Sequence, residues 1–276
     1  MDSRVLEHTP SWQWPEDAGA ILLDVLEDAN APAADRAVAA ELAGDIVVVN
    51  DELVAALLRI VSDAGQPDEL RGQAAVALGP VLETGDIEGF DLSDPLADVP
   101  ITEATFHRIQ RTLRDLYHDA SAPMEVRRRI LEASVRAPEE WHAGAVRAAP
   151  HSNEPLWRLT AVFCMHYIKG FDAEIVEALE SDDEETHYQA VLAAGAHGVE
   201  AAWPHVVRII ERERSDKLLL LAPIEAVASI RPDEAEDVLA EPWELDDEEI
   251  EDAIHEALSL AGVESWDDEE DEEDGF

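Results

Sequence analysis

Apolar residues recur at helical spacing along most of the chain. In the stretch 68–79, an acidic start and a terminal glycine enclose apolar residues that share one helical face, namely Leu70, Ala74, Ala77 and Leu78. One amphipathic helix cannot bury such a face alone, so the pattern predicts helices that pack against one another. Strict alternation of apolar and polar residues, which is typical of strands, is missing from the sequence. We therefore expect an all-α fold.

The same period predicts successive pairs of helices. The pairs span 16–29 with 33–44, 51–64 with 68–79, 102–118 with 123–136, 139–149 with 154–169, 172–180 with 184–195, 200–214 with 216–230, and 233–241 with 247–261. Residues 1–15 precede this array as an N-terminal lead-in. Between 84 and 100 the period is lost in a run rich in Gly, Asp and Pro, which predicts a loop insertion. Residues 262–276 are so acidic that we expect a disordered tail.

Basic residues occupy equivalent positions in the second helices of five pairs. They are Arg36, Arg71, Arg127, Arg158 and His187, at intervals of 35, 56, 31 and 29 residues. The long interval contains the predicted loop. Small residues such as Ala74 and Gly79 follow in step and would let neighbouring helices approach closely. A repeat of about 30 residues with two helices is typical of helical solenoids.

These residues resemble the HEAT-repeat superfamily, in particular the short HEAT-like repeats first described in phycobilisome lyases. The stretch Asp68-Glu-Leu-Arg71-x-x-Ala74-Ala75-x-Ala77-Leu78-Gly79 is similar to the second helix of that repeat almost position for position. The resemblance covers about residues 16–261, and it weakens in the last two repeats, where Leu219 and Ile250 replace the Arg. It implies a right-handed α-solenoid of about seven helical hairpins. It also implies acidic partners in neighbouring repeats for the presumed inter-repeat ties Arg36, Arg71, Arg127 and Arg158.

Charge excludes several functions over most of the surface. The formal net charge is −45, from 64 acidic and 19 basic residues, and Lys169 and Lys217 are the only lysines. Such a surface repels nucleic acid and anionic membranes. Dense carboxylates with scarce lysine suit a salt-rich cytosol, so we expect a halophilic source. No apolar run approaches the ~20 residues of a membrane span, and no apolar signal core follows Met1. We expect a cytoplasmic protein.

The sequence contains no recognisable catalytic constellation. Its one cysteine, Cys164, lies in an apolar helical run and is expected to be a buried thiol. Deoxyhypusine hydroxylase, a HEAT-like enzyme, binds two iron ions through several His-Glu dipeptides, whereas this chain has one such dipeptide, His255-Glu256. Phosphate-binding glycine loops are absent as well. We therefore expect no catalytic residue, metal or cofactor.

The middle of the chain is basic by contrast. Residues 101–170 carry a net charge of +2, so the other 206 residues carry −47. On the helix at 102–118, two histidines and two arginines fall within an arc of about 60°. The partner helix adds two arginines expected to face solvent, and two tryptophans lie in the same region. The candidate partner-binding residues are His107, Arg111, Arg114, His118, Arg128, Arg136, Trp141 and Trp157.

From these features we expect a non-catalytic scaffold that binds another protein on the curved surface of the solenoid, through its Arg-rich middle. Nucleic-acid binding by the same basic patch is the alternative, because HEAT-like DNA glycosylases use a basic groove lined by Trp and Asp. A HEAT-like lyase or another enzyme is the third reading.

The acidic tail suggests a separate contact. Its end, which includes Trp266 and Phe276, is similar in kind to the Phe-terminated tip of bacterial single-stranded-DNA-binding proteins, but the Ile-Pro of that tip is missing. Such a tail could bind a partner, cover the basic stripe of Arg111 and Arg114, or only keep the protein soluble.

Overall fold

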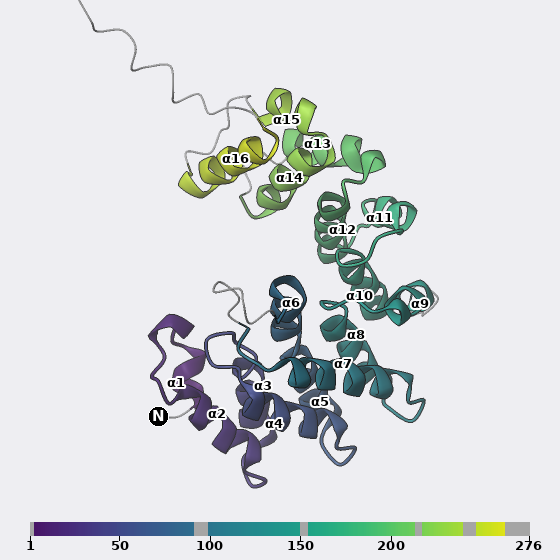
Figure 1. The fold of residues 1–276 in the computed structure, drawn as a ribbon. Coiled ribbons are helices and arrows are strands. Elements are labelled where there is room, and N and C mark those ends of the chain that lie inside the picture. The colour runs from purple at the N-terminus through teal and green to yellow at the C-terminus, as the bar shows by residue number, and fades with distance from the viewer. Residues whose placement is uncertain (1–2, 91–98, 150–153, 213–216, 240–246, 263–276) are drawn as a thin grey trace, which may run out of the picture. The chain divides into compact units, whose positions relative to one another are not determined.

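The computed structural model describes residues 3–90, 99–149, 154–212, 217–239 and 247–262. All regular secondary structure in these ranges is helical (Figure 1), so the predicted all-α class is confirmed. By its internal contacts the chain divides into two compact units, residues 1–148 and residues 149–276. Each unit consists of successive helical hairpins in a HEAT-like arrangement, and the two are described separately.

The first unit is built in two layers. Its helices in the described residues are α1 (Ser3–Glu7), α2 (Ala18–Glu27), α3 (Ala33–Leu42), α4 (Asp51–Ser62), α5 (Asp68–Val76), α6 (Gly79–Glu88), α7 (Glu103–His118), α8 (Met124–Ser134) and α9 (Glu140–Ala148). The second helices of the hairpins, α3, α5 and α8, pack in succession, and the first helices, α2, α4 and α7, pack in succession against them. Fully buried aliphatic side chains from both layers form the core, among them Leu22, Leu57, Leu70, Ile109 and Ile130.

The second unit repeats this arrangement. It contains α10 (Pro155–Met165), α11 (Asp172–Ala178), α12 (Glu184–His197), α13 (Trp203–Arg212), α14 (Lys217–Ile230), α15 (Pro232–Leu239) and α16 (Glu248–Leu260). Helices α10, α12, α14 and α16 pack in succession, and α11, α13 and α15 pack against members of that row. The core includes Ile175, Val206, Ile210, Ile224 and Ile250.

Small residues set how closely neighbouring helices approach, as their spacing predicts. A Cβ atom on Gly44, just after α3, would lie 2.3 Å from the carbonyl oxygen of Ala77, just after α5. A Cβ atom on Gly195 in α12 would lie 3.0 Å from the Cα atom of Ala226 in α14. Real Cβ atoms are not found so close to backbone atoms, so only glycine fits these two crossings.

Three hairpins of the first unit share one turn, which our sequence reasoning missed. Each turn reads Asp-Ala-x-x-Pro and begins at Asp28, Asp63 or Asp119. In each, the aspartate accepts a 2.8 Å hydrogen bond from the backbone N–H two residues later. The proline then caps the second helix and fixes the backbone torsion at which that helix begins.

The predicted arginines act within this turn. Each lies four residues after the proline and donates to the carbonyl of the second-last residue of the preceding helix: Arg36 to Leu26 at 3.1 Å, Arg71 to Val61 at 3.0 Å, and Arg127 to Tyr117 at 2.7 Å. Helix C-termini carry unpaired carbonyls and partial negative charge, so a guanidinium there is favourable. The hydrogen bonds thus close each hairpin on itself, where the sequence led us to expect links to acidic groups of the next repeat.

A weaker link to the next repeat is also present. Arg36 donates a 2.8 Å hydrogen bond to the amide oxygen of Gln66 in the following turn. The pKa of Asp63 is lowered by its hydrogen bonds from Gln66 and Gly65, and further by the charges of Arg71 and Arg36. Electrostatic attraction therefore extends from one turn to the next, although the direct hydrogen bonds stay mostly within a hairpin.

The structure corrects the element boundaries near residue 79. Helix α5 ends at Val76, and α6 begins at Gly79 and runs to Glu88, so helix occupies the first part of the predicted 84–100 loop. Pro80 in the first turn of α6 favours this start. Gly79 is required because a Cβ atom there would lie 2.8 Å from Cδ of Arg136 in α8. Residues 91–98, and Trp266 and Phe276 of the tail, lie outside the described residues.

In the described part of the chain we find no helix with both the length and the apolar character that a membrane crossing requires.

Candidate functional site

The predicted basic stripe lies on one side of α7, where it is partly neutralised. His107, Arg111 and His118 are exposed, and Arg114 is about two-fifths exposed. Arg114 Nη1 lies 3.3 Å from Oε1 of Glu139, and His107 contacts Gln110 and Glu103. Arg111 makes no hydrogen bond or ion pair with any described residue. The stripe therefore presents less positive charge than its sequence suggests.

The two arginines expected to face solvent on α8 serve the fold instead. Arg128 is only 4% exposed, and its guanidinium lies 2.5 Å from Glu125 and 3.4 Å from Glu132. Burial opposes its charge, but these two carboxylates outweigh that effect and raise its pKa. Arg136 forms an ion pair with Glu83 and so joins α8 to α6. Both side chains are unavailable as simple contacts for a partner.

The two candidate tryptophans are also engaged. Trp157 is 9% exposed and belongs to the core of the second unit. Trp141 is half-buried in the first unit, where its indole N–H donates to Glu139 at 3.0 Å. Its ring stacks on His142 with centroids 3.8 Å apart and meets the edge of His118. Neither ring offers an open face of the kind that base stacking requires.

A buried serine and histidine lie side by side between α8 and α9. His142 Nε2 is 3.0 Å from Ser134 Oγ, and the backbone N–H of Glu139 donates to His142 Nδ1 at 2.8 Å. The Ser134 hydroxyl donates to the carbonyl of Ile130 at 2.7 Å. With Nδ1 an acceptor, Nε2 carries the proton, so the serine has no base to activate it. Both residues are buried, and the pair fastens two helices together.

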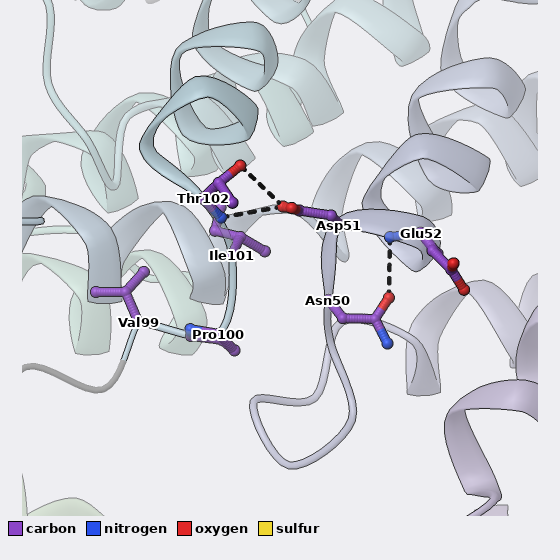
Figure 2. Close-up of a pocket in the computed structure, with 7 residues that line it drawn as sticks. All are labelled: Asn50, Asp51, Glu52, Val99, Pro100, Ile101 and Thr102. Atoms are coloured by element: carbon purple, nitrogen blue, oxygen red, sulfur yellow. Dashed lines mark hydrogen bonds between the residues drawn. The ribbon is translucent and has the colours of Figure 1, made fainter.

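A surface depression of about 480 Å³ lies where α4 and α7 begin. Figure 2 shows Asp51 reaching Thr102, whose N–H and hydroxyl donate to it at 3.0 and 3.3 Å. Burial raises the pKa of Asp51, but hydrogen bonds from Thr102 and Thr105 outweigh this and lower it overall. Asn50 accepts from the backbone N–H groups of Glu52 and Leu53. The chain's own side chains thus occupy donors at both helix N-termini.

The second unit contains a groove of about 440 Å³ between α10, α11 and the start of α12. Its floor is a row of apolar side chains at every third position of α10: Leu156, Leu159, Val162 and Met165. Val162 and Met165 are buried at one end of the row, whereas Leu156 is 55% exposed. A large aliphatic side chain that stays this exposed beside buried neighbours provides apolar surface for a ligand.

The rim of the groove is acidic. Its carboxylates are those of Glu174 and Glu177 on α11, Glu180 just beyond, and Asp183, the N-cap of α12. Asp183 accepts from the N–H of Thr186 at 2.9 Å and from its hydroxyl at 2.6 Å, and both bonds lower its pKa. Glu180 Oε1 lies 3.0 Å from Nδ1 of His205.

Arg158 is the one cationic side chain among the described residues that line this groove. It is exposed, and it makes no hydrogen bond or ion pair with any described residue. In the preceding hairpins the equivalent arginine closes the turn, so the fourth hairpin departs from the pattern at its groove. Sequence reasoning missed this site, although Leu156 and Leu159, beside the more deeply buried positions of α10, signalled it.

No group of three or more His, Cys, Asp or Glu side chains that could hold a metal ion is found in the described residues. What the groove can do chemically is therefore argued from its apolar floor and its carboxylates alone.

Comparison with known proteins gives two similar folds. No protein-family model and no curated protein match the sequence. The solved structure of YibA from Escherichia coli is 16% identical over 93% of this chain and 85% of its own, with a TM-score of 0.48. Human deoxyhypusine hydroxylase, solved in complex with glycerol, is 17% identical over 92% of this chain and 88% of its own, with a TM-score of 0.40.

One functional expectation is corrected at this point. The second of these proteins is by its name an enzyme, which contradicts our expectation of a scaffold defined by the lack of catalysis. The basic middle that was to serve as its contact surface is, in addition, largely paired within the fold, as the contacts of Arg128 and Arg136 show. That expectation is not retained.

Proposed function

We propose that the chain binds a ligand that combines positive charge with an apolar part, and that the groove between α10, α11 and α12 holds it. The observation that carries this proposal is the apolar row of α10 lying beside the carboxylates of Glu174, Glu177 and Glu180. A volume of about 440 Å³ lies within the range of roughly 300–1,000 Å³ that ligand sites occupy.

The two parts of the groove contribute differently. Apolar surface stabilises a bound ligand by roughly 25 cal/mol for each Å² removed from water, largely independent of salt. The carboxylates attract a cation and fix its orientation, but exposed charges are screened within about 3 Å at 1 M salt. The net charge of −45 supports a salt-rich cytoplasm as the working environment. There the floor would supply most of the affinity and the rim most of the selectivity.

Dansylcadaverine, which joins an apolar fluorophore to an ammonium group, tests the proposal. We expect its emission to rise and shift to the blue on binding, with a dissociation constant on the order of tens of micromolar. Dansylglycine, which carries a carboxylate on the same fluorophore, should bind at least tenfold more weakly because the rim repels it.

Two double variants locate the site. Replacing Glu174 and Glu177 with glutamine should weaken dansylcadaverine binding about fivefold at low salt. The matched control, Glu251→Gln with Asp252→Asn on α16, removes the same charge outside the groove and should leave binding unchanged. Equal binding of the two fluorophores, or equal affinity of both variants, would overturn the proposal.

A further inference from the structure

The groove carries two neighbouring rows of side chains with a common spacing. Along α10 the apolar row runs from Leu156 to Met165, a length of about 13 Å at 1.5 Å per residue. Along α11 the carboxylates of Glu174 and Glu177 are three residues apart, and Glu180 follows after three more. Each row thus presents about one side chain per helical turn, or one every ~5 Å.

This spacing selects the shape of the ligand. An α-helix repeats the side chains of one face about every 5.4 Å, and it can carry an apolar row beside a basic one. An extended strand repeats one face every ~7 Å, so its side chains would fall out of step with the rim within two contacts. A small ligand would engage one carboxylate and leave most of the row unused.

We propose, on the basis of the ligand site proposed above, that the occupant is an amphipathic α-helical segment of a partner protein. Its apolar residues, at i, i+3 or i+4, and i+7, lie along the floor from Leu156 to Val162. Its Lys or Arg residues lie on one flank and face Glu174, Glu177 and Glu180. This mode uses every turn of both rows.

Charge determines which side of the helix faces which wall. Arg158 on α10 has no partner among the described residues and repels a cation placed over it. The basic flank of the ligand therefore turns toward α11, and a neutral or acidic residue faces Arg158. Nucleic acid, anionic lipid and acidic peptides are disfavoured as occupants, because the rim carries four carboxylates against one guanidinium.

The test uses the full chain and a fluorescein-labelled peptide of about 18 residues, with Leu on one helical face and Lys along one flank. The first comparison peptide has the same composition, but its residues are shuffled so that no apolar face forms. The second keeps the order and carries two central prolines that break the helix. Because all three peptides share one charge, general attraction to an acidic protein cannot distinguish them. Anisotropy is measured at 0.1 and 1 M KCl.

We expect the helical peptide to bind at least tenfold more tightly than either comparison peptide, and circular dichroism to show a gain of helix on binding. Glu174→Gln with Glu177→Gln should weaken it about fivefold at 0.1 M KCl, and Leu156→Gln with Leu159→Gln should weaken it at both salt concentrations. Thermal unfolding confirms that each variant folds. The control pair Glu251→Gln with Asp252→Asn should have no effect.

The outcomes separate the two proposals. If the shuffled and proline-containing peptides bind as tightly as the helical one, the helical ligand is wrong while the cationic apolar site stands. The same holds if dansylcadaverine binds in the groove and no peptide does. If neither dansylcadaverine nor any peptide binds, the ligand site itself is wrong.

Discussion

The Nε2 atom of His142 lies 3.0 Å from the hydroxyl oxygen of Ser134, and both side chains are buried between α8 and α9. Burial lowers the pKa of His142 from 6.5 to about 4, because the charged ring would lose its hydration. The backbone carbonyl of Glu139, 3.2 Å from Nδ1, opposes part of this shift. The neutral ring is therefore a condition for folding in this region.

We expect acid to destabilise the protein between pH 6.5 and about pH 4. The unfolded chain protonates His142 below its ordinary pKa of 6.5, while the folded chain keeps it neutral down to about 4. Unfolding thus takes up a proton, and stability that is complete above pH 6.5 is lost as the pH falls through this window. The loss attributable to this group reaches roughly 3 kcal/mol.

Urea unfolding at pH 7.5, 6.5, 5.5 and 4.5 measures this effect. His142→Gln should be less stable than the natural protein at pH 7.5, and its stability should fall less steeply below pH 6.5. His255→Gln, which removes an exposed histidine from α16, should keep the natural pH dependence. An equally steep decline in His142→Gln would contradict the assignment.

Arg71 tests the role of the arginines that close the turns. Its side chain is 4% exposed and donates to the carbonyl of Val61. Arg71→Ala should cost about 2–4 kcal/mol, because it leaves that carbonyl unpaired and opens a cavity. The control is Arg59→Ala, whose side chain is 65% exposed and pairs with Glu27. It should cost at most about 0.5 kcal/mol. Chemical denaturation at neutral pH measures both, and equal losses would refute a structural role for Arg71.

The sequence predicted the helices well because their signals are local. Apolar spacing, proline starts and acidic first turns placed most helix ends of both units within a few residues. Gly79 was misread as a stop, since a glycine that ends a helix and one that accommodates Arg136 look alike in sequence. The difference lies in a neighbour 57 positions away along the chain.

Charge was read less well than helix position. Arg128 fell on the face expected to be exposed, but Glu125 and Glu132 at i−3 and i+4 enclose it. Such pairing depends on side-chain conformations that periodicity does not report. The groove was missed for a related reason, because it needs α10 and α11 side by side. Leu159 and Glu177 are 18 residues apart, and neither is unusual alone.

Two glycines should respond in opposite ways to alanine. At Gly44 the added Cβ atom would clash with the backbone of Ala77 at 2.3 Å, so Gly44→Ala should destabilise the protein by about 1–3 kcal/mol. At Gly144 in α9 nothing lies within 4 Å of such an atom. Gly144→Ala should stabilise by about 0.5–1 kcal/mol, because alanine favours the helix. Thermal melts distinguish the two, and shifts of the same sign would show that close packing is not decisive at Gly44.

Salt should stabilise the fold strongly. With a net charge of −45, repulsion between carboxylates favours unfolding, and added ions screen it. We expect the melting temperature to rise by at least about 10 °C between 0.1 and 2 M KCl. Most of the rise should occur below about 0.5 M, where the Debye length changes most. A melting temperature that does not change with salt would argue against adaptation to a salt-rich cytoplasm.

Arg158 provides a gain-of-binding test of the groove. Its positive charge repels a cationic ligand, so Arg158→Gln should tighten binding of the helical Lys peptide about threefold at 0.1 M KCl and have little effect at 1 M. Arg158→Glu should tighten it further. The control is Arg208→Gln, which removes an exposed arginine from α13, outside the groove. It changes net charge by the same amount as Arg158→Gln, so an equal gain would show that binding follows total charge. Weaker binding after Arg158→Gln would instead mean that Arg158 contacts the ligand directly, through an acidic residue or a carbonyl.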